Sequence, residues 1–176
     1  AALMRLNQCD KVEPYMLQVL EKDPTDIDIL SNYGLLRASR GDLVQAEVLL
    51  RRALHKAPGF MQAWFNLGLV MRSQARLEAT ERAYLSALEV DGDNPEILLN
   101  YGGLLVEFHR FIEAEQCVRK VLALKPDYIN AHIGLGMLLK DQGRMQESMA
   151  ALRRAIEIDP QEPSAHSSLL FVINCI

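Results

Sequence analysis

The sequence predicts an all-α chain of stacked helix pairs. This prediction rests on residues that recur at one fixed interval. Glycine returns every 34 residues, at Gly34, Gly68, Gly102 and Gly136. Small residues and proline return at the same interval in three further columns. These columns are Ala46, Thr80, Ala114 and Ser148; Ala53, Ala87, Val121 and Ala155; and Pro24, Pro58, Pro126 and Pro160, with Gly92 in the remaining proline place. Self-similarity at a fixed period is the signature of a stacked repeat protein.

The first stretch, residues 1–26, reads as the remnant of a truncated first repeat whose last helix ends near Lys22. Pro14 disfavours a helix interior there, because proline lacks an N–H and crowds the preceding turn. We therefore expect this helix to begin late, near Pro14, with a kinked helix as the alternative. Since the chain opens inside a repeat and without Met, we also expect it to be a piece of a longer protein.

Four complete units follow, and each reads as two helices with a turn between them. The units span 27–60, 61–94, 95–128 and 129–162, and residues 163–176 begin a further first helix or a capping helix. In the first unit Gly41 ends one helix, Asp42 caps the next, and Pro58 follows the second helix. Pro95 suits the first turn of its helix, where a missing N–H costs nothing.

The glycine column needs a physical reason, because glycine inside a helix costs about 1 kcal/mol relative to alanine. The absence of a side chain lets the paired helix approach closely, and the facing column of small residues completes that contact. We therefore expect Gly68→Leu to destabilise the fold strongly by overpacking.

Several columns together resemble the tetratricopeptide repeat, and the resemblance covers essentially all 176 residues. In unit 61–94 the residues that carry it are Trp64, Leu67, Gly68, Tyr84 and Ala87. Departures such as Gly92 for proline and Val121 for alanine leave the pattern intact. The resemblance implies a right-handed superhelical solenoid of antiparallel helix pairs. It also implies that the first helices line a concave groove that holds other proteins or peptides.

A further column consists of Asn32, Asn66 and Asn100, which we expect to point into that groove. An amide offers donors and an acceptor, which suits the backbone of an extended peptide. The alternative is that these asparagines hold adjacent first helices together. The expected groove lining also includes Phe65, Leu69, Leu99, Ile133 and Met137. Beside them, Gly103 and Gly134 predict either a pocket or loose packing.

Composition argues against several classes of partner. The 19 Lys and Arg are interspersed with 23 Asp and Glu, and the net charge is -4, so we expect no nucleic-acid footprint. No apolar run approaches the ~20 residues that span a bilayer, and no secretory signal opens the chain. Basic pairs recur on the predicted second helices, at Arg51-Arg52, Arg119-Lys120 and Arg153-Arg154. They either belong to a solvent-exposed face or bind an anionic partner. Glu47 and Glu115 stand four residues before Arg51 and Arg119, which favours the solvated face.

Nothing in the sequence predicts catalysis, a cofactor or a metal site. The cysteines, Cys9, Cys117 and Cys175, are odd in number and lack CxxC spacing, which disfavours disulfides and zinc. A reducing, cytoplasmic location is the simpler interpretation. His132 and His166 share the column of Trp64, and we expect them to be packing residues. No HExxH, P-loop or nucleophile motif occurs.

The last segment is apolar where a terminal capping helix should be polar. We expect its apolar side chains to contact another subunit or more of the same chain; these are Leu170, Phe171, Ile173 and Ile176. The segment also resembles the junction of O-linked N-acetylglucosamine transferase-like enzymes, on Ser167, Leu169, Leu170 and Asn174. That resemblance implies a substrate-recruiting arm of a larger glycosyltransferase.

Three functional hypotheses result. The leading one is a non-catalytic interaction module that binds a peptide or protein segment in its concave groove. The second is the recruiting arm of a larger glycosyltransferase, and the third is a scaffold that self-associates through the apolar last helix. The identity of the partner does not follow from the residues, because a fold does not fix its function.

Overall fold

The computed structural model describes residues 2–175, with side chains described from residue 12 onward. Within this range the chain forms ten α-helices and no strand, so the predicted all-α class is confirmed. The helices are α1 (Ala2–Lys22), α2 (Ile27–Ser39), α3 (Leu43–Lys56), α4 (Met61–Ser73), α5 (Leu77–Val90), α6 (Pro95–Glu107), α7 (Phe111–Leu124), α8 (Ile129–Asp141), α9 (Met145–Ile158) and α10 (Pro163–Ile173).

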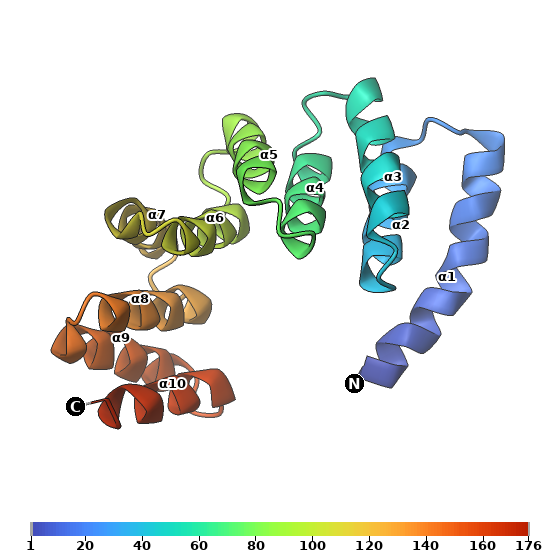
Figure 1. Cartoon of the computed structure of the whole chain (residues 1–176). Coiled ribbons are helices and arrows are strands. Elements are labelled where there is room, and N and C mark those ends of the chain that lie inside the picture. The colour runs from blue at the N-terminus through green and yellow to red at the C-terminus, as the bar shows by residue number, and fades with distance from the viewer. Residues whose placement is uncertain (1, 176) are drawn as a thin grey trace. The chain divides into compact units, whose positions relative to one another are not determined.

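The helices group into two compact units, Ala1–Asp91 and Gly92–Ile176. In unit 1 the closest partners are α2 with α3 and α4 with α5, while α3 also contacts α4 and α1 lies on α2 (Figure 1). In unit 2 the matching pairs are α6 with α7 and α8 with α9, and α10 lies against α9 and α8. Each unit therefore stacks helix pairs that are adjacent in sequence, as expected of a repeat protein.

Helix boundaries follow the local signals in the sequence. Asp42 accepts a hydrogen bond from the backbone N–H of Gln45 at 3.2 Å and caps α3, as predicted. Asn94 caps α6 in the same way, and Pro95 occupies its first turn. These contacts satisfy backbone donors that the first turn of a helix leaves without partners.

The turn inside each helix pair requires a left-handed backbone at one place. Gly41 and Gly143 supply it with φ of 83° and 74°. Ala75 and His109 occupy the same place in the other two repeats and are held at φ of 57° and 58°. Because a Cβ atom strains this conformation, those two turns are less favourable than the glycine turns.

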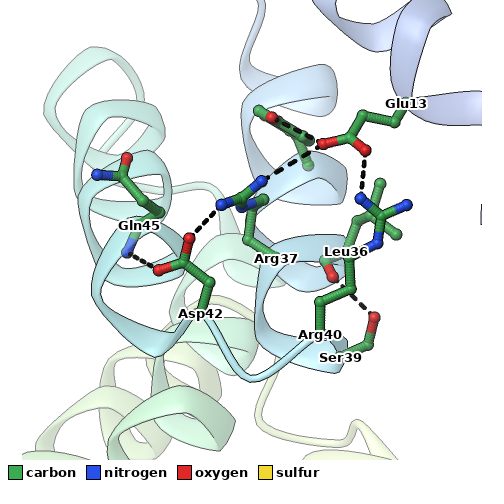
Figure 2. Close-up of polar contacts among 8 residues, drawn as sticks. Glu13, Leu36, Arg37, Ser39, Arg40, Asp42 and Gln45 are labelled. Atoms are coloured by element: carbon green, nitrogen blue, oxygen red, sulfur yellow. Dashed lines mark hydrogen bonds and ion pairs between the residues drawn. The ribbon is translucent and has the colours of Figure 1, made fainter. Parts of the chain in front are cut away.

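The expectation that the helix before Lys22 begins near Pro14 is wrong, because α1 runs from Ala2 through Pro14 to Lys22. Glu13, the residue before Pro14, is held in place by side chains of α2 and of the turn that follows it. The carboxylate of Glu13 accepts a hydrogen bond from Tyr33 at 3.1 Å and pairs with Arg37 and Arg40 (Figure 2). These contacts act at the point where the proline weakens the helix, so tertiary interactions hold it continuous.

The same cluster shifts the pKa values of its members. The hydrogen bond from Arg40 lowers the pKa of Glu13, which keeps its carboxylate charged. Arg37 also pairs with Asp42, and this hydrogen bond lowers the pKa of the Asp42 carboxyl. Arg37 therefore joins the carboxylates of Glu13 and Asp42, from α1 and from the turn before α3 (Figure 2).

The close approach expected at the glycine column is confirmed at Gly68 and Gly136. A Cβ atom on Gly68 would lie 2.4 Å from Cε1 of Tyr84, and one on Gly136 would lie 2.5 Å from Cγ of Leu152. The Ser148 hydroxyl also donates a hydrogen bond to the carbonyl of Gly136 at 2.6 Å. Both glycines therefore leave room for the facing second helix, because these distances are far below van der Waals contact.

The other two glycines of the column differ from each other. A Cβ atom on Gly34 would lie 2.9 Å from Cγ of Leu50, which is still too close. On Gly102 the nearest atom would be the carbonyl oxygen of Ala114 at 3.5 Å, an ordinary contact. The difference arises because α7 presents Val118 at the place where α3 presents the larger Leu50.

Candidate functional site

The first helices of unit 1 are joined by a buried polar network. Asn66 is 1% exposed, and its Nδ2 donates to the Ser31 hydroxyl at 3.1 Å. Its Oδ1 accepts a hydrogen bond from Nε2 of Gln62 at 3.2 Å. Both ends of the amide are thus hydrogen-bonded within unit 1, and Asn66 joins α4 to α2. This is the role that the alternative interpretation gives the asparagines, namely to hold adjacent first helices together.

Phe65 also lies inside unit 1 rather than on an open surface. It is 4% exposed, and its ring centroid lies 5.9 Å from that of Tyr84 on α5. An aromatic pair at this distance contributes to packing between helices. Of the residues expected in the groove, Asn32 is exposed on α2 and Leu69 is half-buried on α4.

Unit 2 lacks the polar network at the same repeat positions. Two repeats after Ser31 and Asn66 stand Leu99 and Gly134, neither of which has a polar side chain. A Cβ atom on Gly134 would meet nothing within 4 Å beyond its own stretch of helix. Leu99 and Met137 are half-buried. The first helices of unit 2 therefore leave open space where those of unit 1 are closed.

Asn100 and Ile133 complete this part of unit 2. Asn100 is half-buried, and its Nδ2 donates to the carbonyl of Glu96 at 2.9 Å. Ile133 packs against the cluster of Met149, Leu152 and Val172, so its side chain supports the surface from the α9 and α10 side. We name the α6–α8 surface by its residues, which are Leu99, Asn100, Ile133, Gly134 and Met137.

The last helix exposes the apolar side chains that were expected there. Leu170, Phe171 and Ile173 are 61%, 51% and 47% exposed. The ammonium of Lys140 on α8 lies 4.9 Å from the Phe171 ring centroid, a cation–π contact within unit 2. Ile176 lies outside the described residues. Contact of this helix with another subunit or domain stays a prediction.

The histidines of the Trp64 column, which we expected to be packing residues, are half-buried at His132 and exposed at His166, and each contacts a backbone carbonyl. Trp64 donates its indole N–H to the carbonyl of Pro58 at 2.7 Å. Nε2 of His132 lies 2.7 Å from the carbonyl of Pro126, and His166 repeats this contact with Pro160 at 2.8 Å. Each ring thereby fastens a first helix to the turn before it.

A compensating contact occurs where this column holds leucine, and sequence reasoning missed it. Beside Leu30, Arg52 donates to the carbonyl of Pro24 at 2.9 Å. Lys120 donates to the carbonyl of Gly92 at 2.7 Å, in the repeat where Leu98 takes the ring's place. The signal was present in the sequence, because a basic residue stands 22 places after each of these two leucines.

Two ion-pair clusters recur at a spacing of two repeats. Glu47 pairs with Arg51 at 2.9 Å and with Arg76 at 2.7 Å. Glu115 pairs with Arg119 and Arg144, both at 2.7 Å. The pairs four residues apart are therefore confirmed. Partial burial opposes ionisation of each glutamate, but the arginine hydrogen bonds and charges outweigh it and lower both pKa values.

The described part of the chain shows no cluster of metal-binding side chains and no activated cysteine. No three His, Cys, Asp or Glu residues there are arranged to hold a metal ion. Cys117 is half-buried and free, and burial raises the pKa of its thiol, which makes it a poor nucleophile. Cys175 is free and exposed. No helix within residues 2–175 combines the length and apolarity needed to cross a bilayer.

Comparison with protein families identifies the repeat. Two family models described as tetratricopeptide repeat match residues 34–95 and 109–170, which together make up more than two thirds of the chain. No curated protein matches the chain in sequence. The matches lend no support to the glycosyltransferase resemblance.

Solved structures share the fold along most of the chain. Protein pilF of Pseudomonas aeruginosa aligns with a TM-score of 0.77 and 25% identity, over 85% of this chain and 68% of its own. TTC0263, a TPR protein of Thermus thermophilus, aligns with a TM-score of 0.79 and 18% identity, over 98% and 94%. YrrB, described as a TPR protein with an unusual peptide-binding site, aligns with a TM-score of 0.73 and 19% identity, over 91% and 82%.

Proposed function

The chain is a tetratricopeptide repeat protein, and we propose that its α6–α8 surface binds an extended peptide segment of a partner protein. The fold makes it a protein-interaction module in general. The narrower proposal concerns where the partner binds, and it assigns that role to unit 2 rather than to the whole column of asparagines.

One observation carries the proposal, namely the open space at Gly134. A Cβ atom there would meet nothing within 4 Å, although Gly134 lies in the middle of α8. Glycine at such a place costs about 1 kcal/mol of helix stability relative to alanine. No close approach of a second helix accounts for it, unlike Gly68 and Gly136. A ligand that approaches the backbone would account for it.

The surrounding side chains define the chemistry of the peptide. Leu99 and Met137 are half-buried on neighbouring first helices and offer an apolar seat for one side chain of the ligand. Methionine adapts to ligands of different shape because its side chain is flexible and polarizable. Asn100 adds an amide that suits the backbone of an extended peptide. We therefore propose an extended segment with one apolar side chain over Gly134.

The remaining parts of the proposal follow from the sequence. It gives the chain no catalytic step and no cofactor, because no catalytic motif occurs. It also places the protein in the cytoplasm, a location that the free cysteines Cys117 and Cys175 favour. YrrB supports the peptide chemistry by analogy of fold, since its description names a peptide-binding site.

The test uses a displayed library of random peptides selected on the intact chain. The selected peptides are then measured by isothermal titration calorimetry against the wild type, Gly134→Phe and Ala150→Phe. Gly134→Phe fills the proposed seat, and we expect it to weaken binding by at least about tenfold. Ala150 is exposed on α9, so Ala150→Phe adds the same ring outside the surface and should leave binding unchanged.

Two results would contradict the proposal. One is a library that yields no peptide with measurable affinity for the wild type. The other is a set of peptides that bind Gly134→Phe as tightly as they bind Ala150→Phe. Circular dichroism of both variants controls for the fold, since a Cβ atom on Gly134 meets nothing within 4 Å and Ala150 is exposed.

A further inference from the structure

A cavity lies in unit 1 between the turn before α2 and α3. It has a volume of about 490 Å³, is open to solvent and is lined by the turn before α2, by Leu30 and by one side of α3. Pro24, Leu30 and Val48 form the apolar part of its lining. Its basic part consists of four side chains of α3, which are Arg51, Arg52, His55 and Lys56.

The cavity coincides with a missing ring in the repeat. Leu30 occupies the place that Trp64, His132 and His166 hold elsewhere, where an aromatic ring reaches the carbonyl of the preceding turn. Leu30 is too short for this contact, and Arg52 donates to that carbonyl in its place. The site therefore has a proline turn, an apolar wall and a fixed guanidinium, but no ring of its own.

All four basic side chains occur together only in this repeat, although a basic pair returns at Arg119-Lys120 and Arg153-Arg154. One repeat later the places of Arg51, Arg52, His55 and Lys56 hold Leu85, Ser86, Glu89 and Val90. In the last repeat Glu157 and Ile158 follow the basic pair. No carboxylate lines the cavity, whereas the chain as a whole is acidic, with a net charge of -4.

Neighbouring carboxylates cancel only part of this charge. Glu47 pairs with Arg51. Asp23 accepts two hydrogen bonds from Thr25, which lower its pKa, and the charge of Lys56 lowers it further. Arg52 has its contact with a neutral carbonyl. A carboxylate that enters the cavity would therefore meet donors suited to charge-assisted hydrogen bonds.

We propose that this cavity binds an acidic peptide segment in which a tryptophan or another aromatic residue stands next to Glu or Asp. The aromatic ring fills the place that Trp64 fills in the next repeat and lies against Pro24, Leu30 and Val48. The carboxylate beside it pairs with Arg52 and Lys56. The site differs from the α6–α8 surface in unit, in helices and in ligand charge.

The lining favours a peptide over other anions. A free phosphate or a nucleic-acid backbone would use the basic groups but leave the apolar wall in water, which forfeits about 25 cal/mol for every Å² of apolar surface. A ring with an adjacent carboxylate satisfies both parts of the lining at once.

The test measures fluorescence anisotropy of a labelled Gly-Ser-Glu-Trp-Glu-Ser-Gly peptide against the intact chain. Two companion peptides replace both Glu by Gln, or Trp by Ala. We expect saturable binding of the first peptide that weakens as salt is raised. Each companion should bind at least about tenfold more weakly. Inorganic phosphate and a single-stranded thymidine oligonucleotide serve as competitors, and neither should displace the peptide at equal concentration.

Variants of α3 locate the site. Val48→Glu places a carboxylate in the cavity, and Val44→Glu makes the same change one turn earlier on α3, at an exposed residue outside the lining. We expect Val48→Glu to weaken binding at least about tenfold and Val44→Glu to leave it unchanged. Leu30→Trp, which supplies the ring that Trp64 provides in the next repeat, should likewise weaken binding at least about tenfold.

Four results would overturn the proposal. These are no saturable binding, equal binding of the Gln peptide, equal effects of Val48→Glu and Val44→Glu, or displacement by phosphate or the oligonucleotide. Since Val48 is 46% exposed, its substitution keeps the test valid even where Leu30→Trp disturbs the core. Gly134→Phe should not change the affinity for this peptide. The proposal for this cavity and the proposal for the α6–α8 surface can therefore be tested separately.

Discussion

Units 1 and 2 build the same first-helix face from the same repeat and finish it differently. In unit 1, Asn66 is hydrogen-bonded to Ser31 and is 1% exposed, so this pair of side chains fills the space between α2 and α4. In unit 2, the equivalent residues Leu99 and Gly134 make no such bond, and space remains beside Gly134. We propose that the residues at these two repeat-equivalent places decide whether a first-helix surface is internal packing or a seat for a ligand.

The glycine column shows a second difference between the units. Tyr84 faces Gly68 in unit 1, and Val118 faces Gly102 in unit 2. The need for glycine thus depends on the residue opposite and not on the period alone. The first prediction tests this contrast, and the later ones address smaller differences.

We expect Gly68→Ala to cost about 3 kcal/mol, because its Cβ would lie 2.4 Å from the Tyr84 ring and overpacking carries penalties of this size. Gly102→Ala should instead be neutral or stabilise by up to about 1 kcal/mol, since alanine favours helix. Urea denaturation of both variants measures the difference. A Gly68→Ala penalty that persists in a Tyr84→Val background would show that the ring is not its cause.

Asn66→Ala should cost about 2 kcal/mol, because it removes hydrogen bonds to Ser31 and Gln62 inside unit 1. Asn100→Ala should cost little, since that amide only caps the carbonyl of Glu96 on its own helix. The same denaturation experiment compares the two. Equal costs would mean that the asparagines play one role in both units.

The left-handed turns offer a gain in stability in each unit. Replacing Ala75 or His109 by glycine relieves a backbone at φ of 57° or 58°, and we expect a gain of up to about 1 kcal/mol. The control is Gly41→Ala, which imposes the same strain at φ 83° and should lower the melting temperature. A loss of stability in Ala75→Gly would exclude strain as the main effect.

The ion-pair clusters of Glu47 and Glu115 are alike in the two units, so we expect equally small effects on stability when either glutamate is replaced. The folded state lowers the pKa of Glu47 and Glu115 below the ordinary 4.5. Each carboxylate therefore contributes stability above that pH and loses it as the pH falls through the lower, folded pKa. Glu47→Gln and Glu115→Gln should each cost less than about 1 kcal/mol at pH 7, and acid titration should erase both costs. A cost that persists in acid would contradict the ionic origin.

Much of the fold follows from the sequence, because the 34-residue period places glycines, prolines and caps on helices directly. The helix through Pro14 did not follow, since Glu13 is fixed by Tyr33 and Arg40 far along the chain. The site was harder to predict. The sequence placed Asn66 and Asn100 in one column, but only the packing of α2 against α4 reveals that Asn66 reaches Ser31. The cavity beside Leu30 likewise lies where this repeat lacks the ring that Trp64 supplies in the next one.

The central claim is that residues at two places open or close the first-helix face, and exchange of those residues between units tests it most directly. Leu99→Ser combined with Gly134→Asn imports the unit 1 pair into unit 2. Titration of a peptide selected on the wild type should then show affinity lower by at least about tenfold, with the helical content unchanged. Wild-type affinity in this double variant would contradict the claim.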